Sequence, residues 1–266
     1  MLWEDLTVLQ FEQAVKEAGV CILPIGVLEK HGNHLPLGTD VITAREICIA
    51  ASKKESAVVF PYYFLGQIAE GRHFAGTVSI PHKLLMDNLL AICDEIGRNG
   101  FKKIIILSGH GWNSQFLQFF AQEMPRLNRD YCVYTGFSWR LTAEQRQKLA
   151  QETNSAELGA HAGLSETSLI MHLRPELVHM QTQDPKESEP QSRLKDIEKH
   201  GLFTGFDWFA NSPNHAGGNH TASSKELGEM IFNMAVDNVI EMIKSVKADL
   251  VSPQLVKEYA TLTLQQ

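Results

Sequence analysis

Short apolar runs alternate with longer amphipathic stretches along the first half of the chain. Runs of this length that are apolar throughout predict strands buried on both faces, as in a parallel sheet. The predicted strands are 19–25, 57–60, 103–107 and 131–134. Apolar positions recur with helical spacing at 41–52, 82–99 and 113–123. This alternation favours an α/β protein with a three-layer α/β/α architecture and a mostly parallel central sheet.

The pattern changes in the second half of the chain. Helical spacing returns at 142–151, 166–173 and 222–246. Residues 181–220 are polar and rich in Pro, Gly, Asn and Ser, which predicts a long loop or insertion of the kind that usually serves function or interaction. Residues 253–266 are expected to form a peripheral tail. The chain contains no internal repeat, so we expect residues 1–266 to form a single α/β domain.

Composition and charge narrow the class of protein. The 24 Lys and Arg against 31 Asp and Glu give 266 residues a net charge of −7, which disfavours nucleic acid as a partner. No window approaches the roughly 18 consecutive apolar residues of a membrane span, and the N-terminus lacks a signal-peptide layout. The four cysteines are scattered without a CxxC pair, as in proteins of a reducing compartment. We therefore expect a soluble, cytoplasmic protein.

The densest polar cluster, 29–40, directly follows the first predicted strand and contains Glu29, His31 and Asp40. Ligands of open α/β sheets bind outside the carboxyl ends of the strands, so these side chains are delivered to that place. Mixed imidazole and carboxylate ligands are ordinary for zinc or manganese. The simpler interpretation is a polar loop with Asp40 as the N-cap of the next helix.

Two further clusters have similar chemistry. His110 follows the strand 103–107 between two glycines, although Asn113 could make this segment an ordinary capped turn. His161 precedes a predicted helix, and Glu166 lies near the start of that helix, where a carboxylate is favoured even without a function. Histidine is suited to move protons beside a metal-bound water. If the strands are neighbours, His110 and the 29–40 cluster meet in one crevice.

The remaining candidates carry weaker signals. Trp139, Trp208, Phe206 and Phe209 could line a pocket, but aromatic side chains are more often part of the core. The spacing of His215 and His220 could provide an extra metal site, although a flexible surface loop is the favoured interpretation. No G-x-S-x-G motif is present, and no cysteine has an adjacent histidine, so covalent nucleophilic catalysis has no support.

Three motifs in order resemble the signature stretches of the creatininase (creatinine amidohydrolase) family. They are EKHGNHLPLGTD at 29–40, SGHGWN at 108–113 and HAGLSETS at 161–168, and FAGTVS at 74–79 resembles a fourth. The resemblance covers residues 3–245. It implies a creatininase-like α/β fold, a dinuclear metal centre, hydrolysis of small cyclic amides or related compounds, and a homo-oligomer that is often a hexamer.

The resemblance also implies roles for individual residues. Glu29 and His110 would bind one metal ion, His31 would bind the other, and Asp40 would bridge both. Glu166 would lie close to the metal ions, as a further ligand, and His161 would be the catalytic histidine. His34 matches a family histidine outside the usual ligand set. The expected cofactor is Zn²⁺ or Mn²⁺, with Fe²⁺ as a further option, at one or two ions per subunit.

The chain also departs from the creatininase pattern. Creatininase proper has a ligand glutamate two residues after the second-motif histidine, where this chain has Trp112. It has a Trp-Asp pair upstream of the third motif, where this chain has Glu157 and Leu158. Creatinine is therefore not the expected substrate. The second metal ion would have fewer protein ligands, or only one ion would bind tightly.

Three functions are consistent with these residues. The favoured hypothesis is a metal-dependent hydrolase that cleaves a C–N bond of a small cyclic substrate with metal-activated water. The first alternative keeps the metal site but cleaves a C–C bond of an oxidised cyclic polyol, of the diketo-inositol type. The second alternative is a protein that binds a metabolite in the same crevice without catalysis.

Overall fold

A four-stranded parallel sheet forms the centre of the computed structural model, which describes residues 1–153 and 159–264. The strands are β1 (Cys21–Ile25), β2 (Val58–Val59), β3 (Lys103–Ser108) and β4 (Cys132–Phe137), and their order in the sheet is β2-β1-β3-β4. All three pairings are parallel. The prediction of a mostly parallel sheet is therefore confirmed, and each predicted strand is present with slightly different bounds.

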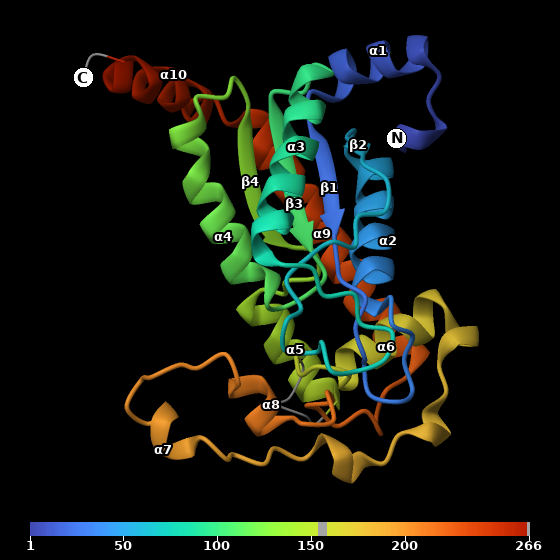
Figure 1. Cartoon of the computed structure of the whole chain (residues 1–266). Coiled ribbons are helices and arrows are strands. Elements are labelled where there is room, and N and C mark those ends of the chain that lie inside the picture. The colour runs from blue at the N-terminus through green and yellow to red at the C-terminus, as the bar shows by residue number, and fades with distance from the viewer. Residues whose placement is uncertain (154–158, 265–266) are drawn as a thin grey trace.

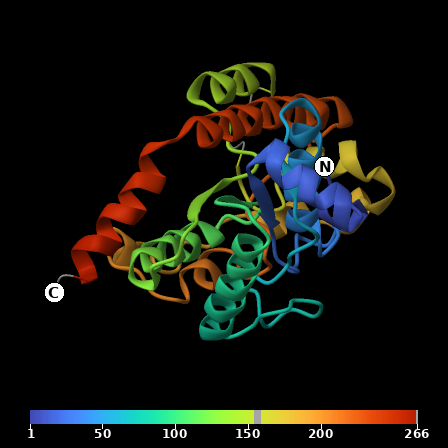
Figure 2. The same ribbon diagram turned by 90° about the horizontal axis from the view of Figure 1, so that it is seen from above.

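Helices cover both faces of this sheet (Figures 1 and 2). One face packs against α1 (Val8–Ala18), α3 (His82–Arg98) and α4 (Asn113–Glu123). The other face packs against α2 (Thr39–Lys54), α6 (Leu164–Leu173) and α9 (Lys225–Ala248). The three-layer α/β/α architecture is confirmed. The two other long helices are α5 (Ala143–Thr153) and α10 (Val251–Leu264).

Alternation along the strands divides the core into two apolar layers. On β1, Ile22 packs with the α2 and α9 layer, whereas Cys21 and Leu23 pack with α3 and α4. Successive side chains of a strand point to opposite faces, so a run that is apolar throughout must be covered on both sides. All four cysteines are buried as free thiols, and burial raises the pKa of Cys93 to about 12, which excludes this thiol as a nucleophile near neutral pH.

The polar segment predicted as a loop crosses the end of the molecule beyond the carboxyl ends of the strands (Figure 1). It contains only short helices. They are η4 (Met180–Thr182), η5 (Pro185–Ser188), α7 (Lys195–Glu198) and α8 (Asp207–Asn211). The other short helices are η1 (Trp3–Asp5), η2 (Met124–Leu127) and η3 (Pro175–Leu177). The tail predicted at 253–266 lies largely within α10, most of whose side chains are exposed.

Two glycines allow the first turn of α2 to approach the ends of β1 and β3. A Cβ atom on Gly109 would lie 2.2 Å from the carbonyl oxygen of Asp40, and one on Gly26 would lie 2.5 Å from the amide nitrogen of Val41. The Gly109 N–H also donates to the carbonyl of Ile25 at 2.8 Å. Close contact between strand ends and helix start therefore places Asp40 at the carboxyl edge of the sheet.

In the part of the chain that the structure describes, no helix combines the length and the hydropathy needed to cross a membrane.

Candidate metal centre

The three sequence clusters come together at the carboxyl edge of the sheet. Glu29 and His31 lie on the segment after β1, and His110 lies on the turn between β3 and α4. Asp40 lies in the first turn of α2. The N-cap of this helix is Gly38, so the simpler interpretation of Asp40 as the N-cap was wrong. All four side chains are buried, with at most 3% of the residue surface exposed.

Asp40 lies between two groups of possible ligands. Its Oδ2 is 3.3 Å from Nδ1 of His110, which is also 2.6 Å from Oε1 of Glu29. Its Oδ1 is 3.1 Å from Nε2 of His31, which is also 3.8 Å from Oε2 of Glu166. Within each group the ligand atoms lie within 4.8 Å of one another, so each could hold a metal ion. The two groups share Asp40 and use different oxygens of its carboxylate.

The imidazole of His31 is oriented as a metal ligand. Its Nδ1 lies 3.2 Å from the main-chain carbonyl oxygen of Glu29. A carbonyl can only accept, so Nδ1 carries the hydrogen of the neutral ring and Nε2 faces the carboxylates. Ligating histidines usually donate their other N–H in this way, which fixes the tautomer.

Two buried oxygens fit a cation better than they fit the protein alone. Oε1 of Glu29 and Oδ2 of Asp40 accept no well-oriented hydrogen bond among the described residues, and their nearest polar neighbour is Nδ1 of His110. Burying such atoms is costly unless they are paired or coordinate a metal. The donor set of two imidazoles and three carboxylates, once Glu166 is included, also suits Zn²⁺ or Mn²⁺. The residues present therefore fit a divalent ion.

The pKa values of the two central histidines also indicate that the buried carboxylates favour a positive charge beside them. Burial by itself lowers the pKa of His31, but the carboxylates of Asp40, Glu29 and Glu166 raise it to about 10. The pKa of His110 is also raised well above its ordinary value, because Glu29 and Asp40 outweigh the effect of burial. Protons on these rings compensate the carboxylates, and metal ions that bind such sites displace protons of this kind.

His161 precedes α6 and Glu166 lies in its first turn, and both side chains lie beside the cluster. Nε2 of His161 is 2.9 Å from the carbonyl oxygen of Lys30, so Nε2 carries the hydrogen and Nδ1 keeps the lone pair. Burial lowers the pKa of His161 to about 3 and outweighs the nearby Glu29. Burial raises the pKa of Glu166 to about 7, although its Oε2 accepts a hydrogen bond from the Ala162 N–H at 2.7 Å.

The expectation of a surface loop around His215 and His220 was wrong. Both residues are buried, with 1% and 2% of their surfaces exposed. His215 reaches the cluster, where its Nε2 is 2.5 Å from Oε2 of Glu29. His220 instead stacks on His34, whose Nε2 is 2.9 Å from Oγ1 of Thr167. The two histidines do not form a metal site of their own, because they contact different residues.

Glu70 is a site residue that the sequence reasoning did not single out. Its side chain is 8% exposed, and its Oε1 lies 3.7 Å from Nε2 of His110. Neither atom has a hydrogen-bond partner among the described residues. Glu70 faces Nε2 of His110, the ring nitrogen opposite the one near Glu29. The available signal was its place four residues before the FAGTVS stretch.

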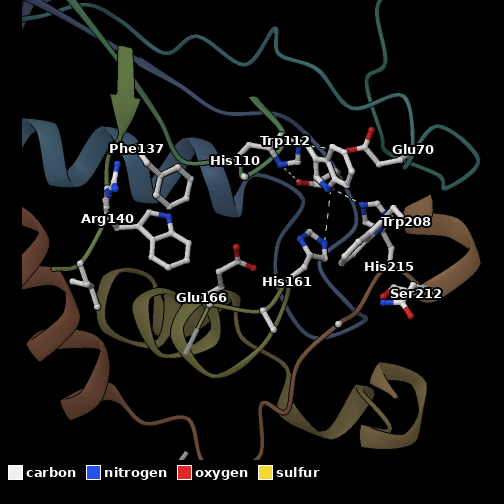
Figure 3. A pocket seen from close by; sticks show the side chains of 18 of the residues that line it. Glu70, His110, Trp112, Phe137, Arg140, His161, Glu166, Trp208, Ser212 and His215 are labelled. Atoms are coloured by element: carbon white, nitrogen blue, oxygen red, sulfur yellow. Dashed lines mark hydrogen bonds and ion pairs between the residues drawn. The ribbon is translucent and has the colours of Figure 1, made fainter. Parts of the chain in front are cut away.

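A cavity of about 390 Å³ opens onto the cluster. In Figure 3 the side chains of His110, His161 and His215 converge there from three separate segments. Trp139 and Trp208 line the cavity, whereas 73% of Phe206 and 40% of Phe209 are exposed. The core placement favoured for these aromatic residues was therefore correct only for Trp139, which also packs in the core. Glu157 and Leu158 lie outside the described residues.

An α/β protein with a buried imidazole and carboxylate cluster at the carboxyl edge of its sheet is the class that these observations define. The family model of creatininase, described as creatinine amidohydrolase, matches residues 4–243. The chain belongs to the creatininase family, as a divergent member.

Curated relatives are similar over most of their length. Creatinine amidohydrolase of Pseudomonas putida is 27% identical over 90% of this chain and 95% of its own. Mycofactocin precursor peptide peptidase of Mycobacterium ulcerans is 28% identical, with 84% and 83% covered. 3-dehydro-scyllo-inosose hydrolase of Thermotoga maritima is 24% identical, with 81% and 69% covered. The relatives are hydrolases with different substrates.

Solved creatininase structures share the fold. A manganese form has a TM-score of 0.74, and a mutant of the zinc–zinc type has 0.75. Each is 24% identical to this chain and covers 92% of it, with 97% of its own length.

Proposed function

We propose that this protein is a divalent-metal-dependent hydrolase that cleaves a C–N amide bond in a small, cyclic substrate. Glu29, Asp40 and His110 would hold one ion, and His31, Asp40 and Glu166 would hold the other. The observation that carries the proposal is the position of Asp40, whose two carboxylate oxygens face two different imidazoles. The manganese and zinc forms of structurally similar creatininases support Mn²⁺ or Zn²⁺ as the ion.

The chemistry supplied by a bound divalent ion is a water whose pKa is lowered toward 7 and a polarised substrate carbonyl. The protein supplies proton transfer. Glu166 lies beside His31 and Asp40 and would be placed to exchange a proton with the bound water or the departing group. The hydrogen bond from Nε2 of His161 to the Lys30 carbonyl leaves Nδ1 of His161 as the free ring nitrogen, which could relay a proton to the departing nitrogen. Such transfer contributes roughly 10²–10⁴-fold to a rate.

Trp112 changes the surroundings of the ions relative to creatininase proper. Its ring stacks on Phe203 at 5.8 Å between centroids, and the residue also lines the cavity. An indole is not a ligand for Zn²⁺ or Mn²⁺, so water or substrate would complete the coordination next to His110. This difference supports a substrate other than creatinine.

The similarity to the inosose hydrolase of Thermotoga maritima favours one alternative. In that case the same residues would support cleavage of a C–C bond in an oxidised cyclic polyol, and the developing charge would be an enolate. Release of ammonia or an amine distinguishes C–N cleavage from C–C cleavage.

We also propose that the protein is a cytoplasmic homo-oligomer, hexameric by family resemblance. Exposed apolar side chains on the crossing segment, such as Leu202 and Phe203, are consistent with contacts between subunits. Light scattering coupled to size-exclusion chromatography measures the subunit number directly.

The test of the metal-dependent function uses Asp40→Asn, which keeps the shape of the side chain and removes its charge. Purified proteins are analysed for bound metal and screened with lactams, N-formyl compounds and cyclic polyol ketones, with and without chelator. We expect wild type to turn over a substrate in a chelator-sensitive way, and Asp40→Asn to lose both metal and turnover. The matched control is Asp237→Asn, because Asp237 is an exposed aspartate of α9 that is not part of the candidate centre. Saturable ligand binding without turnover at any added metal would instead favour the non-catalytic alternative.

A further inference from the structure

His215 contacts the side chain of Glu29 from outside the recognised motifs. The side chain of His215 is 2% exposed, and its Nε2 lies 2.5 Å from Oε2 of Glu29. The two residues are 186 positions apart in the sequence. The long polar segment therefore reaches into the candidate metal centre, which neither its composition nor its spacing indicated.

Trp208 determines which ring nitrogen of His215 donates. The indole Nε1–H of Trp208 can only donate, and it lies 2.9 Å from Nδ1 of His215. Nδ1 must then be the acceptor, so the hydrogen of the neutral ring is on Nε2. The chain of donors runs from Trp208 through His215 to Oε2 of Glu29.

This hydrogen bond distinguishes the two oxygens of Glu29. Oε2 is occupied by His215, whereas Oε1 accepts no well-oriented hydrogen bond among the described residues and lies 2.6 Å from Nδ1 of His110. Rotation of the carboxylate would break the bond to His215. The hydrogen bond from His215 to Oε2 therefore holds the carboxylate in the orientation in which Oε1 faces His110 and Asp40.

The backbone of His215 is also held in place at a conformational cost. Its φ of 54° lies in the left-handed region, which is unfavourable for a residue other than glycine. The carbonyl oxygen of His215 accepts a hydrogen bond from Gly32 N–H at 3.1 Å. A Cβ atom on Gly71 would lie 3.0 Å from the ring, so glycine provides the room for it. Main chain and ring are both tied to the segments that build the centre.

We propose that His215, oriented by Trp208, is a positioning residue that holds the metal ligand Glu29 in its coordinating orientation. The inference rests on the proposed metal centre. Outer partners of metal ligands typically contribute 10–100-fold to metal affinity. The effect is expected at the ion bound by Glu29, Asp40 and His110, and not at the ion bound by His31 and Glu166.

The experiment measures Mn²⁺ binding by isothermal titration calorimetry, without any substrate. We expect His215→Leu to weaken binding of one ion by roughly 10–100-fold and to leave the other nearly unchanged. His215→Gln should largely restore the affinity, because its amide nitrogen can donate at a similar reach. Trp208→Phe, which keeps the ring but not the N–H, should give a smaller loss. His220→Leu is the matched control, since it removes a buried histidine of the same segment that contacts His34 instead.

The melting temperature of each metal-free variant separates positioning from folding. Equal losses for both ions with lower stability of the metal-free form, or failure of His215→Gln to restore binding, would show a merely structural role. Unchanged Mn²⁺ binding by His215→Leu would overturn the positioning role alone. A wild-type protein that binds neither Mn²⁺ nor Zn²⁺ would overturn the metal centre and this inference together.

Discussion

The candidate centre has two halves that are built differently. The strand-end half consists of Glu29, His31, Asp40 and His110, which follow β1 and β3 or begin α2. These residues sit directly on the sheet, where main-chain hydrogen bonds and close glycine contacts fix the backbone. The distal half consists of His161, Glu166 and His215, which come from the start of α6 and from the long polar segment.

The two halves differ in backbone strain as well as in origin. Ala162, which follows His161, and His215 have positive φ values of 53° and 54°. Such conformations persist only where the surroundings enforce them, and they concentrate at functional sites. In the proposed centre the sheet edge would supply most of the metal ligands, whereas the distal half would supply Glu166, proton transfer by His161 and part of the cavity wall. Loops are also the parts that vary most between relatives, which agrees with the different substrates of the curated relatives.

The sharpest test of this division is His161→Ala. We expect kcat to fall roughly 10²–10⁴-fold, because the proton carrier is lost, while metal content stays at the wild-type level. Elemental analysis and steady-state kinetics with the substrate found in the screen measure the two effects separately. His200→Ala is the matched control, since His200 is an exposed histidine that follows α7. Loss of metal in His161→Ala would remove the distinction between the two halves.

A second test disturbs the packing of α9 against α6, the helix that carries Glu166. A Cβ atom on Gly228 would lie 1.8 Å from the carbonyl oxygen of Ser168, where α9 packs against α6. We expect Gly228→Ala to destabilise the protein by about 1–3 kcal/mol, as overpacked cores do. Helix propensity alone predicts the opposite sign, since alanine is favoured over glycine by about 1 kcal/mol. Urea unfolding measures the difference.

The control for this change is Gly205→Ala, because a Cβ atom there would meet nothing within 4 Å. Because Ser168 is two residues from Glu166, kcat/KM of Gly228→Ala should also fall, by more than its metal affinity. A stabilised Gly228→Ala would show that α9 can move away from α6 without cost.

The strand-end half could be predicted from the sequence because its position follows from the sheet. Apolar runs locate β1 and β3, and parallel strands bring their carboxyl ends to one edge, so Glu29, Asp40 and His110 were expected to meet there if the two strands are neighbours. The structure pairs β1 with β3. Motif resemblance then suggested their roles. The hydrophobic pattern did not predict that α2 starts at Thr39 rather than after Asp40. The position of this helix start depends on how closely Gly109 lets the turn approach the sheet.

The distal half was only partly predictable. His161 and Glu166 were indicated by their motif, but His215 lies in a segment without periodicity, and only its path in three dimensions brings it to Glu29. Sequence alone did not distinguish His215 from His220, since both have glycine or asparagine neighbours. Glu70 was missed for the same reason, because the chain around it has no regular structure that would fix its direction.

A third effect, seen only on a change of pH, concerns His34, which joins the two halves. It belongs to the segment after β1, bonds Thr167 of α6 and stacks on His220. Burial, with smaller effects from His220 and His31, lowers the pKa of His34 to about 4 from its ordinary 6.5. The unfolded chain therefore binds more protons at this site between these values, so stability is present above pH 6.5 and is lost as the pH falls toward 4.

For this one group the loss from pH 7 to pH 5 is about 2 kcal/mol. His34→Gln keeps a partner for Thr167 but cannot titrate, so its unfolding free energy should fall by that much less than the wild-type value over the same interval. Urea unfolding of both metal-free proteins at the two pH values measures the difference, and groups that titrate in both proteins cancel. Because ionised His34 would lie beside His220 and His31, the acid-sensitive contact is the one that holds the distal half against the strand-end half. Parallel pH profiles for the two proteins would show that other contacts join the halves.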